Sequence, residues 1–193
     1  MQMKKIALLL TSLFISCIAF SQSKEYFKLT PNGFTSMDDK PYCVVQVEGT
    51  ASEIYDKVLR SIGRLYNSPQ TVASKVENQQ ISINAIRPNV TEYKFNGKTF
   101  IDAHYTLTIE FKDGRVRVFA PNIQKLADCR TDNEILFICE KLNPMTQVKD
   151  QSIYNFKDQS LRSPELKANI EKSFNDLIEA LLFSKLESSV DDC

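Results

Sequence analysis

The sequence predicts an α+β fold in which an antiparallel sheet has the order strand, helix, four strands, helix, with the helices packed on one face. Three observations predict this fold. Several extended segments alternate apolar and polar residues, as half-buried strands do. The later segments are joined by links that are too short for a crossover, so their neighbours are antiparallel. Two helical stretches each carry one apolar face, and the sheet is the only large surface that can cover it.

The composition is typical of one soluble globular domain, since the chain has 193 residues, 42% of them hydrophobic and 25% charged. The 24 basic and 24 acidic side chains give a formal net charge of zero. A protein that binds a phosphate backbone needs clustered excess Lys and Arg, so no nucleic-acid partner is expected. The single histidine excludes a multi-histidine metal site, and no phosphate-binding loop or catalytic motif occurs. Neither a metal nor a cofactor is therefore expected.

The first 21 residues have the features of a secretory signal peptide. Lys4 and Lys5 precede an apolar stretch, and Ala19-Phe20-Ser21 is a small-residue cleavage pattern. The apolar stretch has about 15 residues, fewer than the roughly 20 that span a bilayer as a helix, so no integral membrane domain is expected. The mature protein is expected to begin at Gln22 and to be periplasmic or secreted.

Cys17 offers an alternative, in which cleavage before a lipid-modified cysteine gives an anchored lipoprotein. Ser16 is the small residue that such cleavage needs, but the usual leucine three positions before the cysteine is replaced by Phe14. Simple export is the favoured interpretation.

The N-terminal third of the mature chain is predicted to contain an arm, a strand and a helix. Residues 22–41 are polar and interrupted by prolines and a glycine, so they are interpreted as an N-terminal arm. Residues 42–48 are β-branched and aromatic and predict a strand. Thr50-Ala51-Ser52-Glu53 fits a capping box, and the apolar residues from Ile54 to Tyr66 follow at helical spacing.

Four extended segments follow, at residues 71–76, 81–86, 91–95 and 98–111, and residues 115–120 return after the turn at 112–114. Asn96-Gly97 is a strong signal for a two-residue hairpin. The strand at 98–111 alternates two sets of residues. Its predicted core face carries Tyr105, Leu107, Ile109 and Phe111, and its outer face carries His104, Thr106, Thr108 and Glu110.

Pro121 is expected to end the sheet and to begin an insertion over residues 121–162. Within the insertion, residues 134–142 form either a short helix or an edge strand. Ser163 then caps a helix that begins at Pro164 and runs to residue 187, with an apolar face that includes Phe174. Residues 42–187 thus make a single domain, followed by an acidic tail at 188–193.

Two stretches resemble a known family. They are Val47-Glu48-Gly49-Thr50-Ala51-Ser52-Glu53-Ile54-Tyr55 and Tyr105-Thr106-Leu107-Thr108-Ile109-Glu110-Phe111-Lys112-Asp113-Gly114-Arg115. The chain from about residue 42 to residue 126 resembles the exported bacterial proteins of domain-of-unknown-function family 4468, which are described as having a TATA-binding-protein-like (TBP-like) fold. The resemblance implies that fold and a place in the bacterial envelope. It implies no catalytic residue, because the family has no established activity.

The candidate site residues lie on the predicted outer face of the sheet and in the insertion. His104 is the only imidazole, and Arg115 and Arg117 share its face, so these three residues are the candidate ligand-binding set for an acidic or aromatic partner. Export into an oxidising compartment leaves several cysteine pairings open, and a local disulfide between Cys129 and Cys139 is the candidate among them. Cys43, inside a predicted strand, is expected to be buried and inert.

These features favour a non-enzymatic envelope protein that binds another protein or a small molecule between the long helix and the sheet. The alternative is a small hydrolase or thiol enzyme that uses His104 with a carboxylate or a cysteine. No local catalytic signature accompanies His104, so no catalytic residue is assigned.

Overall fold

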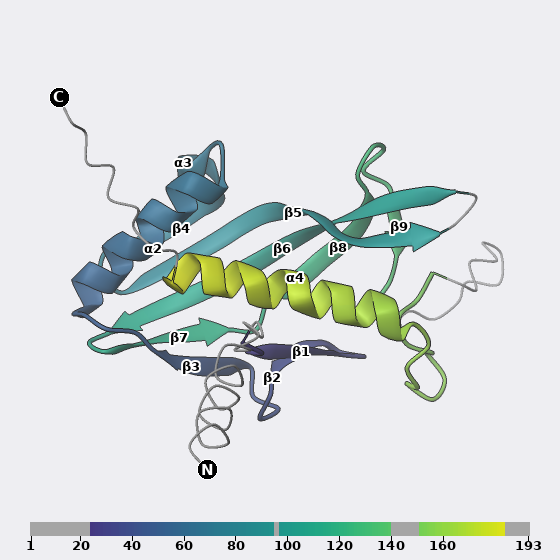
Figure 1. Cartoon of the computed structure of the whole chain (residues 1–193), viewed down its shortest axis with the longest axis horizontal. Helices are drawn as coiled ribbons and strands as arrows, with labels where there is room; N and C mark the ends of the chain where they lie inside the picture. Colours follow the sequence, from purple (N-terminus) through teal and green to yellow (C-terminus); the bar gives the residue numbers. More distant parts are fainter. Residues whose placement is uncertain (1–23, 95–96, 140–150, 184–193) are drawn as a thin grey trace, which may run out of the picture.

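The computed structural model describes residues 24–94, 97–139 and 151–183 (Figure 1). The predicted signal peptide, Cys17 and the acidic tail lie outside these residues. The elements follow in this order: β1 (Phe27–Thr30), β2 (Gly33–Ser36), β3 (Tyr42–Gln46), α2 (Ala51–Leu65), α3 (Pro69–Val72), β4 (Ala73–Val76), β5 (Gln80–Lys94), β6 (Lys98–Lys112), β7 (Arg115–Phe119), β8 (Asn122–Asp128), β9 (Glu134–Leu136) and α4 (Pro164–Phe183).

The fold is α+β, and the described strands pair antiparallel. In the described part of the chain, seven strands form one sheet in the order β3-β7-β6-β5-β4, with β8 beside β6 and β9 beside β8. One edge of the long strand β6 pairs with β5. The other edge is divided, because β7 pairs with residues 109–112 and β8 pairs with residues 101–106. β7 and β8 therefore follow each other along the same edge of β6.

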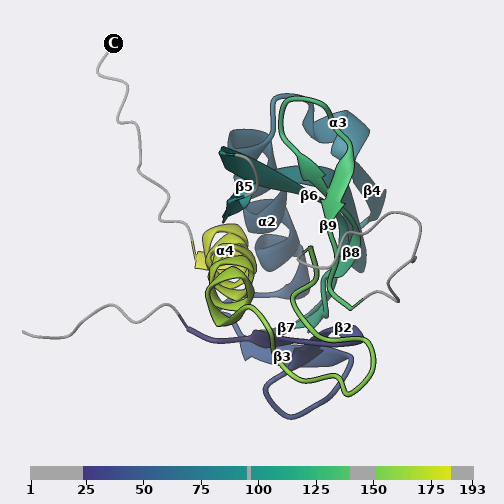
Figure 2. The same ribbon diagram turned by 90° about the vertical axis from the view of Figure 1, so that its right-hand side faces the viewer.

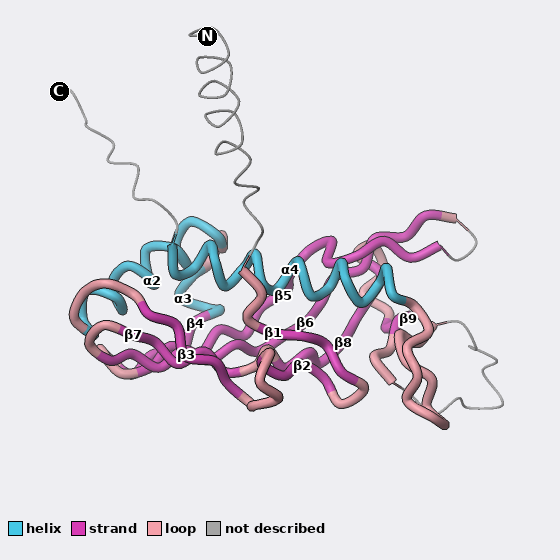
Figure 3. Tube along the Cα trace, turned by 60° about the horizontal axis from the view of Figure 1, so that its bottom comes forward, coloured by secondary structure: helices cyan, strands magenta, loops and turns pink. Residues whose placement is uncertain are grey.

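The predicted alternation of β6 is confirmed. Tyr105, Leu107 and Ile109 are fully buried, whereas His104, Thr106 and Thr108 are only half-buried on the opposite face. Figure 3 shows α2 and α4 together on one side of the sheet. The helices thus cover the apolar face, and the face that carries His104 stays open.

Helix α2 begins at the predicted capping box. The Thr50 side chain accepts a hydrogen bond from the Glu53 amide, and the Glu53 carboxylate accepts one from the Thr50 amide at 2.7 Å. The Ala51 amide donates to the Asp113 carboxylate at 2.8 Å, which ties the start of the helix to the β6–β7 turn. The Tyr55 ring packs edge-on against Phe111 with centroids 5.4 Å apart, which joins the helix to β6.

Helix α4 lies across the sheet with the predicted apolar face buried against it (Figure 1). The Phe174 ring lies between two other rings, with centroid distances of 5.2 Å to Tyr105 and 5.1 Å to Phe34. Side chains therefore fill the space between the helix and the sheet. Around Phe174, core packing thus occupies the space in which a ligand site was expected.

The segment expected to be an N-terminal arm contains a β-hairpin that belongs to the core. Strands β1 and β2 pair with each other, and Phe27 and Leu29 of β1 are each only 1% exposed. Figure 2 shows this hairpin beside α4. The hairpin escaped the sequence analysis because its strands have only four residues each, which is too short for a clear alternation.

Side chains of α4 take the place of a strand along the second edge of β1. The Asn175 side-chain oxygen accepts hydrogen bonds from the Tyr26 and Phe27 amides at 3.0 Å, and its nitrogen donates to the Phe27 carbonyl at 2.9 Å. The Glu171 carboxylate accepts the Leu29 amide at 2.6 Å. The unpaired edge of the short hairpin is thereby satisfied.

Pro121 interrupts the sheet but does not end it, so the expectation that the sheet ends at this residue is wrong. β8 begins one residue later and resumes pairing with β6. Proline removes one backbone donor and breaks the ladder locally, after which the chain continues along the same edge. Residues 134–136 form the edge strand β9, one of the two alternatives for that segment. Residues 140–142 of that segment lie outside the described part of the chain.

The predicted strands at 81–86 and 91–95 are parts of one strand, β5, that pairs with β6 on both sides of a register shift between Arg87 and Thr91. Asn89 has a positive φ of 53° at this irregularity. The segment predicted as a strand at 71–76 is divided, because its first two residues belong to α3 and the rest forms β4. Asn96 of the predicted hairpin turn lies outside the described residues.

Candidate functional site

The three candidate site residues share the open face of the sheet but do not form one site. His104 of β6 lies opposite Lys125 of β8, while Arg117 of β7 lies opposite Glu110 of β6. His104 and Glu110 are six positions apart on one strand, which is about 20 Å at 3.3 Å per residue. The structure therefore separates His104 from Arg115 and Arg117.

His104 belongs to a small ion-pair cluster at the β8–β9 turn. Its Nε2 atom lies 2.8 Å from the Asp132 carboxylate, and the Lys125 ammonium lies 2.9 Å from the same oxygen. The hydrogen bond from Lys125, with that from His104, lowers the pKa of Asp132 below its ordinary value. The neighbouring Thr106 hydroxyl accepts a hydrogen bond from Gln124 at 3.0 Å. The Asp132 carboxylate thus holds the imidazole of His104 and the ammonium group of Lys125 side by side.

Cys129 and Cys139 are both free thiols in the structure, so the candidate disulfide does not join them. Leu126 of β8 pairs with Leu136 of β9, so the returning chain carries Cys139 toward the beginning of β8, whereas Cys129 follows its end. The Cys139 thiol lies 3.7 Å from the Asn155 carbonyl, to which it donates. Antiparallel pairing therefore keeps the two sulfur atoms apart.

Neither Cys43 nor Cys139 is an activated nucleophile. Burial raises the pKa of the half-buried Cys43 to about 11, and burial also raises the pKa of Cys139. Cys43 lies on β3 opposite Val118 of β7, whereas His104 lies on β6. Within the described ranges, no three His, Cys, Asp or Glu side chains gather in a group that could hold a metal ion.

Arg115 and Arg117 belong to a second cluster, at the corner where β3, β7 and β6 meet. The Arg117 guanidinium lies 3.1 Å from the Glu110 carboxylate and 4.8 Å from the centre of the Tyr42 ring. Arg115 lies directly opposite Lys112 on β6. A shallow hollow of about 140 Å³ lies among these side chains and Val44. We call Val44, Lys112, Arg115 and Arg117 the basic corner.

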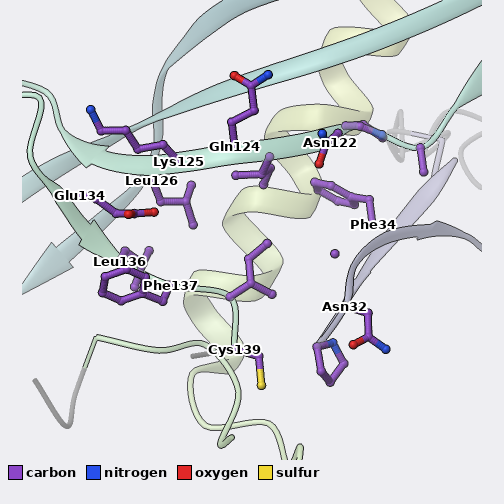
Figure 4. Close-up of a pocket in the computed structure, with 16 residues that line it drawn as sticks. Asn32, Phe34, Asn122, Gln124, Lys125, Leu126, Glu134, Leu136, Phe137 and Cys139 are labelled. Atoms are coloured by element: carbon purple, nitrogen blue, oxygen red, sulfur yellow. The ribbon is translucent and has the colours of Figure 1, made fainter. Parts of the chain in front are cut away.

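A larger cavity of about 470 Å³ lies where the N-terminal hairpin meets β8 and the segment after β9 (Figure 4). We call it the hairpin cavity. Its lining comes from residues 31–34, 120–126, 134 and 136–139. Figure 4 shows the Leu126 side chain pointing into the cavity, while Gln124 points away from it. Its walls mix apolar side chains with polar ones, among them Asn32, Asn122 and Glu134.

The hairpin cavity could not be predicted from the sequence because three separate segments form it. Ile123 and Leu126 lie opposite Tyr105 and Ala103 of β6, so they belong to the core side of the sheet. Phe34 faces them from the hairpin, which was expected to be an arm. Ile123 and Leu126 are three positions apart, so they show no strand alternation, and both fell inside the expected insertion.

Comparison with known proteins gives two similar solved structures. No family model and no curated protein matches the chain. A DUF4468 family protein from Bacteroides ovatus is 16% identical with a TM-score of 0.41, over 72% of this chain and 84% of that chain. A TBP-like protein from Parabacteroides distasonis is 17% identical with a TM-score of 0.38, over 72% of this chain and 90% of that chain. These are the family and the fold that the sequence resembles.

None of the described helices is both long enough and apolar enough to cross a bilayer.

Proposed function

We propose that the protein is an exported, non-enzymatic binding module that holds a small amphipathic molecule in the hairpin cavity. The observation that carries this proposal is the cavity itself, whose volume of about 470 Å³ is within the size range of small-molecule sites. Its walls are rigidly supported, because Leu126 and Leu136 are each at most 2% exposed. A preformed cavity binds a ligand without a large ordering cost.

The polar groups of the cavity favour a ligand with one polar end. Asn32 and Asn122 both line the cavity with side-chain amides, which can donate to and accept from a ligand. Burial of apolar surface supplies affinity at about 25 cal/mol per Å², and a few polar contacts fix orientation. An amphipathic molecule with a compact apolar body satisfies both parts of the lining.

Two features support a binding role over catalysis. His104 and Lys125 share the Asp132 carboxylate, and the adjacent Thr106 hydroxyl is bonded to Gln124 rather than to the imidazole. The raised pKa of Cys43 and of Cys139 keeps these thiols protonated near neutral pH. A hydrolase or thiol enzyme built on His104 would need an activated nucleophile beside the imidazole.

Export is the second part of the proposal and rests on the signal-peptide pattern of the first 21 residues. We expect protein purified from the envelope of its own cells to begin at Gln22. N-terminal sequencing and intact mass measurement test this. A diacylglycerol-modified Cys17 at the mature N-terminus would show a lipoprotein instead.

The ligand proposal is tested by native mass spectrometry of protein isolated from its own envelope. We expect the wild type to retain an organic molecule that denaturation releases. The variant Ile123→Trp fills the cavity and is expected to lose this molecule. The matched control Ile86→Trp adds the same ring at a residue that is 48% exposed on β5, and it should retain the molecule. Retention by Ile123→Trp, or a ligand-free wild type, would reject the hairpin cavity as the site.

A further inference from the structure

We propose that the basic corner binds an acidic, extended peptide segment of a partner protein. This surface is independent of the hairpin cavity. The basic corner lies on the open face of the sheet where β3, β7 and β6 meet, whereas the cavity lies on the core side of β8. The inference therefore adds a macromolecular partner to the small ligand of the proposed function.

The strand register arranges the basic corner in two parallel rows. One row runs across the sheet through Val44, Arg117 and Glu110. The next row runs through Gln46, Arg115 and Lys112. Arg115 and Arg117 are two positions apart on β7, which places their backbones about 6.6 Å apart. Alternate side chains of an extended peptide also lie about 6.6 Å apart. The spacing of the two rows therefore equals the spacing of side chains on one face of an extended peptide.

The charges of the basic corner are unbalanced. It holds three cationic side chains, and the neighbouring carboxylate of Glu110 is engaged by Arg117 at 3.1 Å. Lys112 and Arg115 face each other directly across β6 and β7, and neither forms an ion pair with any described residue. Like charges directly opposite each other destabilise a strand pair, and a carboxylate placed between them removes that cost.

Asp113, the acidic residue closest in sequence, does not neutralise Lys112 or Arg115. The Asp113 carboxylate accepts the Ala51 amide at 2.8 Å at the beginning of α2, so it is committed to the helix. An outside carboxylate is therefore the group that complements Lys112 and Arg115. Bonds from Arg and Lys to a carboxylate are charge-assisted and stronger than neutral hydrogen bonds.

An apolar group beside the cations favours a peptide over a bare anion. Val44 is 51% exposed and lines the hollow of about 140 Å³ together with the two arginines. Arg117 is held in place by Glu110 and by the face of Tyr42, so this side of the hollow is ordered before binding. A segment that alternates acidic and apolar residues can place a carboxylate on Arg115 and an apolar side chain on Val44.

The test measures binding of a fluorescent peptide of alternating aspartate and valine residues to the full chain. The double variant K112E/R115E reverses both unpaired charges. The matched control R60E/K75E makes the same change in net charge at exposed positions of α2 and β4. Circular dichroism melts of both variants verify that they fold.

We expect K112E/R115E to weaken peptide binding about tenfold or more, while R60E/K75E changes it less than about twofold. Binding should weaken as salt rises, since these charges are exposed to solvent. The proposal is overturned if the peptide fails to bind, or if a peptide with asparagine in place of aspartate binds equally well. It is also overturned if single-stranded DNA of the same charge binds as tightly, because the surface would then be a general polyanion site.

Discussion

At the scale of single residues, the cysteines differ in their exposure to solvent and in the pKa of their thiols. Burial raises the pKa of Cys43 to about 11 and also raises the pKa of Cys139, whereas Cys129 is exposed at the end of β8. Because the thiolate is the reactive form, we expect iodoacetamide near pH 8 to modify Cys129 first and Cys43 last among these three described cysteines. Peptide mapping over a time course measures the order. Equal rates at Cys43 and Cys129 would show that β3 does not protect its thiol.

A second residue-scale prediction concerns Phe174, the ring at the centre of the core. It is fully buried between Tyr105 and Phe34. Phe174→Ala is expected to lower the free energy of unfolding by about 3–5 kcal/mol, as other large-to-small core changes of Phe do. The control Arg117→Ala, on the open face, should lower it by at most about 1 kcal/mol, since exposed ion pairs contribute little. Paired urea melts compare the two, and equal losses would mean that the faces of the sheet are wrongly assigned.

At the scale of elements, one buried side-chain amide makes most of the described backbone hydrogen bonds between α4 and β1. Asn175 is 3% exposed and makes three hydrogen bonds with the backbone of Tyr26 and Phe27. Asn175→Ala leaves those buried groups unpaired, so we expect a loss of about 2–4 kcal/mol in the free energy of unfolding. Hydrogen exchange of the Phe27 amide should accelerate more than that of the Ile109 amide in β6. The neighbouring change Asp176→Ala removes only an exposed pair with Lys172 and should cost about 0.5 kcal/mol or less.

The same helix shows what could and could not be predicted at this scale. The apolar face of α4 follows from residues such as Ile170 and Phe174 at helical spacing, and the structure confirms it. The polar residues Glu171 and Asn175 lie four positions apart, so they share one side of the helix. This spacing indicates that a polar group lies beside α4. It does not say which group, because the partner is the backbone of β1, a strand that the sequence did not predict.

At the scale of the whole molecule, sequence periodicity predicted which face each residue occupies but not which residues meet. Alternation placed His104, Arg115 and Arg117 on the open face, which is correct. Their separation depends on how β7 and β8 divide one edge of β6, and that division depends on pairing beyond Pro121. The hairpin cavity joins segments almost 90 residues apart in sequence, from residue 34 to residue 123, so no local pattern could reveal it.

The acid stability of the whole fold follows from carboxylates in several separate elements. Hydrogen bonds within the Thr50 capping box lower the pKa of Glu53, and a bond from Arg130 lowers that of Asp128. The bond from Lys125 likewise lowers the pKa of Asp132. Each folded pKa lies below that of the unfolded chain, so unfolding takes up protons in acid. These contributions are complete above the unfolded values, about 4, and are lost as the pH falls through the folded values.

We therefore expect the melting temperature to change little between about pH 6 and pH 8 and to fall steadily below about pH 5. The variant E53Q/D132N removes two of the shifted carboxylates from α2 and the β8–β9 turn. It should be less stable than the wild type near pH 7, and its melting temperature should depend less on pH in acid. The control D38N/E48Q removes two carboxylates on the β2–β3 and β3–α2 loops that make no ion pair with a described residue, and it should keep the wild-type slope. An unchanged slope in E53Q/D132N would mean that these bonds do not determine how the fold responds to acid.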